Sequence, residues 1–207
     1  HDRARHSNPA PHTADLASHC RVANVALELT LAHREDASMK AGELAWPNGE
    51  EEAVSPALAA SCGYFILGMG KLGAYELNYS SDIDLIALYD TDRVRYTGTK
   101  TVKQCFIRLT QELMKIMETR TMHGYVFRTD LRLRPDPGAT PVALAVEAAE
   151  TYYHSMAVNW ERSAMIKARV VAGDQTAGKA YLETMARWIW RKNMDFAALN
   201  DIAAIKN

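Results

Sequence analysis

The sequence contains little cysteine and carries almost no net charge. Its 207 residues include three cysteines, Cys20, Cys62 and Cys105, which lie far apart and show no C-x-x-C spacing. Each stands among apolar residues, so we expect reduced, buried thiols, which fits a cytoplasmic location. The formal net charge of −1 provides no overall attraction to nucleic acid, so any phosphate-binding site has to be local. We therefore expect no nucleic-acid partner.

Long apolar runs are also missing. No stretch contains the roughly 18 consecutive apolar residues of a membrane-spanning helix, and no segment resembles a secretory leader, so no membrane partner is expected. The seven histidines show no H-x-x-x-H spacing, which argues against a zinc site. The chain begins HDRARHSNPAP, without Met, and we expect it to be a piece of a longer polypeptide.

The hydrophobic pattern predicts a mixture of strands and helices. Apolar, β-rich runs predict strands over 64–67, 83–89 and 125–135. Apolar residues at helical spacing predict helices over 13–35, 100–121, 146–156, 160–169 and 175–192, and polar segments predict irregular chain over 1–13 and 47–56. This order indicates an α+β fold, a small mixed sheet backed by helices. We expect one domain over 1–207, with a mostly helical lead-in (1–62), a catalytic sheet core (63–145) and a helical remainder (146–207).

A glycine motif, GMGKLG over 68–73, follows the first predicted strand and fits the G-x-G-x-x-G pattern of a dinucleotide-binding loop. Asp92 even lies about 20 residues further on, where a ribose-binding acid is expected. However, only nine residues, AYELNYSSD, separate Gly73 from the next predicted strand, and a parallel crossover needs about a dozen. We therefore disfavour a dinucleotide site. The glycine amides and Lys71 can instead face an anion, with a plain turn as the alternative.

Two acids, Asp82 and Asp84, stand two residues apart at the head of the second predicted strand, so their side chains leave the same face. Carboxylates held this close repel each other, and a divalent cation is the usual reason for such an arrangement. Asp130 lies in another predicted strand, which could bring it against the first two. Three carboxylates beside a serine and a glycine-rich turn are typical of two-metal nucleotidyl transfer with Mg²⁺ or Mn²⁺. Solvated acids at a strand end are the alternative.

A longer composite pattern resembles a known family. GMGKLGAYELNYSSDIDLIALYD, RTDLRLRPDPGATP and YYHSMAVNWERSAMIKARVVAGD resemble segments of the glutamine synthetase adenylyltransferase family, within the polymerase-β-like nucleotidyltransferase superfamily. The resemblance implies that superfamily's fold and a longer enzyme with two such units. One unit transfers AMP from ATP to a tyrosine of glutamine synthetase, and the other removes it by phosphorolysis, releasing ADP. Ala74 and Tyr75 depart from the pattern, in which a second glycine often follows Gly73.

The direction of the reaction is also suggested by this resemblance. NWERSAMIKAR together with GMGKLG is more similar to the adenylyl-removing unit, so we expect deadenylylation of glutamine synthetase and a role in regulating nitrogen assimilation. The adenylylating direction is the first alternative. A degenerate module that only binds nucleotide or a partner is the second, and the intact acids argue against it. For the longer enzyme, the resemblance implies a nitrogen-signalling partner protein of the PII type.

The resemblance also implies roles for particular residues. Asp82, Asp84 and Asp130 would be the catalytic acids and would bind two Mg²⁺ (or Mn²⁺) ions. ATP, ADP and inorganic phosphate would be substrates or products, and their phosphates would contact Gly70, Lys71, Ser81, Arg132, Arg134 and Lys167. On a strand, Arg132 and Arg134 share the face of Asp130, which favours this role for them. A structural salt bridge to the acids is the alternative for both arginines.

Overall fold

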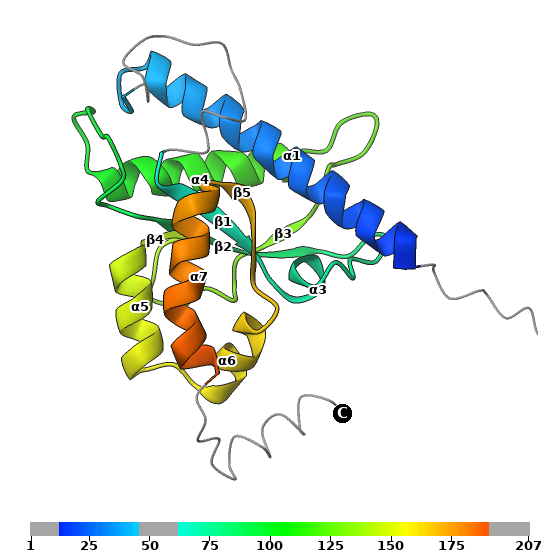
Figure 1. Cartoon of the computed structure of the whole chain (residues 1–207). Helices are drawn as coiled ribbons and strands as arrows, with labels where there is room; N and C mark the ends of the chain where they lie inside the picture. Colours follow the sequence, from blue (N-terminus) through cyan, green and yellow to red (C-terminus); the bar gives the residue numbers. More distant parts are fainter. Residues whose placement is uncertain (1–12, 46–61, 191–207) are drawn as a thin grey trace, which may run out of the picture.

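The computed structural model describes residues 13–45 and 62–190 (Figure 1). In chain order its elements are α1 (Thr13–Lys40), β1 (Tyr64–Gly68), α3 (Gly70–Gly73), β2 (Ile83–Tyr89), α4 (Val102–Glu118), β3 (Thr129–Asp130), β4 (Ala143–Ala145), α5 (Val146–Ser155), α6 (Asn159–Met165), β5 (Arg169–Gly173) and α7 (Gln175–Ile189). Some predictions fall mostly or wholly outside the described residues. They are the irregular segments over 1–13 and 47–56 and the end of the helix predicted to reach residue 192.

The strands form one mixed five-stranded sheet. β1 is antiparallel to both of its neighbours, β2 and β5. The other edge of β2 is shared by two short parallel partners, β3 beside its first residues and β4 beside its last ones. The predicted α+β class is therefore confirmed, and the arrangement is consistent with a polymerase-β-like nucleotidyltransferase fold.

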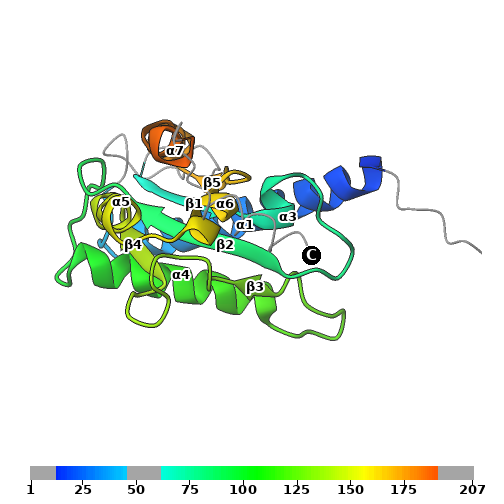
Figure 2. The same cartoon turned by 90° about the horizontal axis from the view of Figure 1, so that it is seen from below.

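Helices cover both faces of the sheet, as Figure 2 shows with α4 on one side and α7 on the other. One buried cluster joins the sheet to α1 and α4 through residues such as Leu27, Leu31 and Phe106. A second cluster joins it to α5 and α7 through residues such as Tyr153 and Met185. Burial of each such side chain contributes about 1.5–3 kcal/mol, so both layers hold the sheet in place.

Helix α4 illustrates how local sequence sets these elements. Thr101 and Gln104 form a reciprocal capping box at its start, which satisfies backbone amides that the helix leaves free. Phe106, Leu109, Leu113 and Met117 are all buried, as the helical spacing predicts. The strong cap and the apolar stripe explain why this helix forms close to its predicted bounds.

Three sequence predictions are wrong in detail. The strand predicted over 125–135 is reduced to Thr129–Asp130, because the chain turns directly afterwards and the Asp130 carboxylate accepts the backbone N–H of Arg132 at 2.8 Å. The helix predicted over 160–169 ends at Met165. The remainder predicted to be helical contains β5, whose run RVVAG pairs with the edge of β1. Such a short apolar run between helices carries no periodicity that would identify a strand.

The three cysteines are free and buried, as predicted. Among the residues that the structure describes, no helix combines the length and the apolar character needed to cross a membrane.

Candidate active site

The predicted acids lie at one end of the central strand. Asp84 is the second residue of β2, and Asp82 immediately precedes that strand. The parallel register of β2 and β3 sets Asp130 directly opposite Asp84. Strand pairing therefore brings together carboxylates that are almost fifty residues apart in the sequence.

Two of these acids form ion pairs with arginines. Asp82 forms an ion pair with Arg128, and the Asp130 carboxylate accepts a hydrogen bond from Nε of Arg132 at 2.8 Å. The hydrogen bonds from Arg132 lower the pKa of Asp130. The structural salt bridge considered as the alternative for Arg132 is thus present in the structure.

Asp84 experiences a different environment. Partial burial raises the pKa of Asp84, the charges of Asp130 and Asp82 raise it further, and Arg132 opposes them. The three acids together therefore concentrate negative charge around Asp84. An all-oxygen donor set of this kind fits Mg²⁺ or Mn²⁺, because a bound cation would relieve the repulsion that raises the pKa of Asp84.

The glycine turn lies against the same carboxylate. Met69 donates its backbone N–H to the carbonyl oxygen of Asp84 at 2.9 Å, and α3 follows as a single helical turn. Gly70 has a φ of +50°, and a methyl group there would lie 3.0 Å from Oδ2 of Asp84. The absence of a side chain at Gly70 leaves the space beside Asp84 open to a ligand.

Gly73 has another role. A methyl group on Gly73 would lie 2.0 Å from the carbonyl oxygen of Lys167, so the turn packs backbone against backbone where the chain approaches β5. Since β1 and β2 are antiparallel, they cannot be the two parallel strands of a dinucleotide-binding unit, which supports the rejection of that site.

The other predicted phosphate contacts are dispersed. Lys71 is exposed on α3, Ser81 is half-buried just before Asp82, and Lys167 forms an ion pair with Glu76 at 3.0 Å. The guanidinium of Arg134 donates to the carbonyl oxygens of Leu131, Pro137 and Thr140, and so it braces the turns that follow β3. Arg134 nevertheless still lines the groove described next.

A groove of about 640 Å³ opens beside Asp82 and Asp130. Most of its lining residues were not among the predicted site residues, and Arg120, Tyr125 and Arg128 are the basic and aromatic ones. The guanidinium carbons of Arg120 and Arg128 lie 5.8 and 6.0 Å from the centre of the Tyr125 ring. The available signal for these three residues was the basic and aromatic segment that leads into RTD and includes its arginine.

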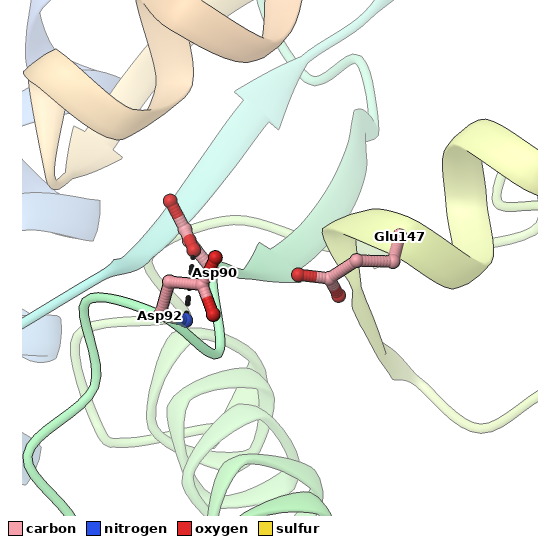
Figure 3. Close-up of side chains that lie close together, drawn as sticks. All are labelled: Asp90, Asp92 and Glu147. Carbon is pink, nitrogen blue, oxygen red and sulfur yellow. Dashed lines mark hydrogen bonds between the residues drawn. The ribbon is translucent and has the colours of Figure 1, made fainter.

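A second acidic cluster lies at the other end of β2. Asp90, Asp92 and Glu147 each bring a carboxylate oxygen within 4.8 Å of the others (Figure 3). Local hydrogen bonds account for this arrangement, because Asp92 donates its N–H to Asp90 at 3.0 Å and Thr91 donates its hydroxyl to Glu147 at 2.9 Å. Within the described chain, the predicted acids do not meet the same 4.8 Å condition, and two of them are turned toward arginines instead.

Carboxylates on two paired strands of a small mixed sheet, next to a glycine turn, are the defining elements of a nucleotidyltransferase domain. Family comparison agrees: the model for glutamate-ammonia ligase adenylyltransferase matches residues 12–184, and the chain belongs to this family.

Similar curated proteins are each named bifunctional glutamine synthetase adenylyltransferase/adenylyl-removing enzyme. The protein of Mesorhizobium japonicum is 50% identical over 193 residues, which cover 93% of this chain and 18% of the relative. The protein of Rhizobium meliloti is 53% identical over 152 residues, covering 73% and 15% respectively. That of Bradyrhizobium sp. strain ORS 278 is 46% identical over 185 residues, covering 89% and 18%. The chain thus spans less than a fifth of the length of these relatives.

Proposed function

We propose that this chain is a nucleotidyltransferase unit that removes AMP from a tyrosine of glutamine synthetase by phosphorolysis. The observation that carries the proposal is the pairing of Asp84 with Asp130 across β2 and β3, with the open backbone of Gly70 beside Asp84. Family membership supports the same class of reaction. The resemblance of NWERSAMIKAR to the removing unit supports this direction over adenylylation from ATP.

In this reaction the AMP group moves from the tyrosine oxygen to an oxygen of inorganic phosphate. An oxygen of inorganic phosphate forms a bond to the α-phosphorus of the AMP group, and the bond from that phosphorus to the tyrosine oxygen breaks. ADP forms, and the tyrosine oxygen leaves and takes up a proton. Negative charge therefore develops on the leaving oxygen while phosphate oxygens crowd together.

In this proposal Asp82, Asp84 and Asp130 hold divalent cations, Mg²⁺ or Mn²⁺. When bound, such ions neutralise charge on the attacking and leaving oxygens. The amides that follow Gly70, together with the hydroxyl of Ser81, orient phosphate oxygens at the same carboxylates. Lys71 and Arg132 add positive charge nearby, and Arg132 also fixes the direction of the Asp130 carboxylate through its hydrogen bonds.

The test uses the 207-residue chain with AMP-modified glutamine synthetase, Mg²⁺ and inorganic phosphate. ADP release supports removal, whereas transfer of AMP from ATP to unmodified glutamine synthetase supports the adding direction. Asp84→Asn is expected to abolish ADP release and Mn²⁺ binding. Asp92→Asn, in the second acidic cluster, is the matched control and should retain both. The assignment is refuted if Asp92→Asn is inactive and Asp84→Asn is not.

Two further expectations concern the longer enzyme. We propose that a PII-type signalling protein acts through parts of the polypeptide beyond this unit. We also propose a cytoplasmic location, which the three free, buried thiols support.

A further inference from the structure

Three hollows follow one another along the end of α4 and the loop after it. The groove of about 640 Å³ beside Asp82 and Asp130 shares Met114, Glu118 and Val142 with a second hollow of about 490 Å³. It shares Tyr125 with a third one of about 440 Å³. We call this continuous surface the α4 groove. A succession of connected hollows suits an extended chain segment better than a single nucleotide, which occupies one concave site.

Two positive charges that line the α4 groove have no carboxylate partner in the described chain. Lys115 and Arg120 are both exposed, and within 13–45 and 62–190 the structure pairs no carboxylate with either. Glu118 is directed to β3, where it accepts the backbone N–H of Thr129 at 3.0 Å. The groove therefore presents two cations without a carboxylate partner in the described chain, and they attract a negatively charged partner.

Apolar and aromatic groups accompany these charges. Met114 and Val142 line the groove, and the guanidiniums of Arg120 and Arg128 both lie near the ring of Tyr125. A tyrosine ring offers a large contact area at a low cost in conformational entropy, which is typical of protein-binding surfaces.

The acids separate this groove from the glycine turn. Gly70 lies against Asp84, whereas the groove is lined by Asp82 and Asp130 and not by Asp84. A phosphate at the glycine turn would thus meet Asp84, and a chain segment in the groove would meet its neighbours Asp82 and Asp130. This arrangement is what transfer between a phosphate and a protein side chain requires.

We propose that the α4 groove binds an acidic polypeptide segment of the protein substrate and delivers its AMP-modified tyrosine to Asp82 and Asp130. The inference rests on the proposed function and adds to it the surface that recognises the substrate. Lys115 and Arg120 attract the acidic residues of that segment, while Tyr125 and Met114 pack against its apolar side chains.

The test compares the double variant Lys115→Gln/Arg120→Gln with the wild-type chain and with Lys103→Gln. Lys103 is an exposed lysine on the same helix that does not line the groove, so it is a matched control. The affinity for AMP-modified glutamine synthetase is measured at low and at physiological ionic strength. We expect the double variant to bind about 3- to 30-fold more weakly and to lose most of the salt dependence, and Lys103→Gln to match the wild type.

Measurements with two small ligands test the docking surface separately from the proposed function. ADP affinity and phosphorolysis of adenylyl-tyrosinamide should be the same in the double variant as in the wild type. Unchanged binding of glutamine synthetase would overturn the docking surface, and an equal loss of ADP affinity would reassign it as a phosphate site. If no substrate yields ADP with the wild-type chain, the proposed function fails. The binding comparison still shows whether the α4 groove binds glutamine synthetase.

Discussion

Replacing Gly73 by alanine tests how closely the glycine turn is packed. The new methyl group would lie 2.0 Å from the carbonyl oxygen of Lys167 and 2.6 Å from that of Gly68. Ordinary contact begins at 3.4 Å, so the backbone has to separate by about 1.4 Å. Neither obstacle is a flexible side chain that could rotate away.

Two effects of opposite sign compete in this variant. Alanine is favoured over glycine in a helix by up to about 1 kcal/mol, but α3 is a single turn and gains less than that. Overpacking against backbone costs about 3 kcal/mol, so destabilisation wins. For a domain of this size, the corresponding fall in melting temperature is about 6–12 °C. Displacing the turn by an ångström also moves Gly70 relative to Asp84, and the catalytic rate should fall on the order of 100-fold.

Calorimetric unfolding and ADP release measure the two consequences separately. Gly138→Ala is the control, because a methyl group there meets only the Asp136 carboxylate at an ordinary distance of 3.8 Å. It should leave both measurements close to those of the wild type. A Gly73→Ala protein that melts within about a degree of the wild type and keeps its activity would show that the backbone contact with Lys167 does not exist.

Three further predictions concern buried and clustered acids. Asp174→Ala removes the N-cap of α7 and the carboxylate that pairs with Arg93 at 3.1 Å, so denaturant titration should show a loss of about 2–4 kcal/mol. Burial raises the pKa of Glu35 to about 8, so the folded state keeps a proton that the unfolded state releases above its lower pKa. The free energy of unfolding should therefore fall by roughly 1.4 kcal/mol per pH unit between pH 5 and 7.5, and Glu35→Gln should remove that slope. Asp84→Asn should raise the melting temperature measured in chelator, since it relieves repulsion from Asp82 and Asp130, and a lower value would contradict the raised pKa of Asp84.

Local pattern was sufficient wherever an element depends on its own residues. IDLIALY predicts β2 because a seven-residue run with six apolar residues and a single acid suits a strand buried on both faces, and the structure gives the same bounds. The apolar stripe of α4 predicts that helix as well, to within three residues at either end. Family membership was predictable too, since three separate motifs between residues 68 and 174 agree, and the family model matches residues 12–184.

Tertiary structure alone decided which residues meet. The parallel register of β2 and β3 sets Asp130 opposite Asp84, and no local signal encodes pairing between segments so far apart in the sequence. The same holds for the ion pair of Arg128 with Asp82 and for the addition of β5 to the sheet. Periodicity and capping depend on neighbours within a turn or two of chain, whereas strand pairing depends on how distant segments bury their faces together. The sequence by itself therefore determined elements such as β2 and α4, the family and the candidate acids, and the fold determined the partners of those acids and the groove beside them.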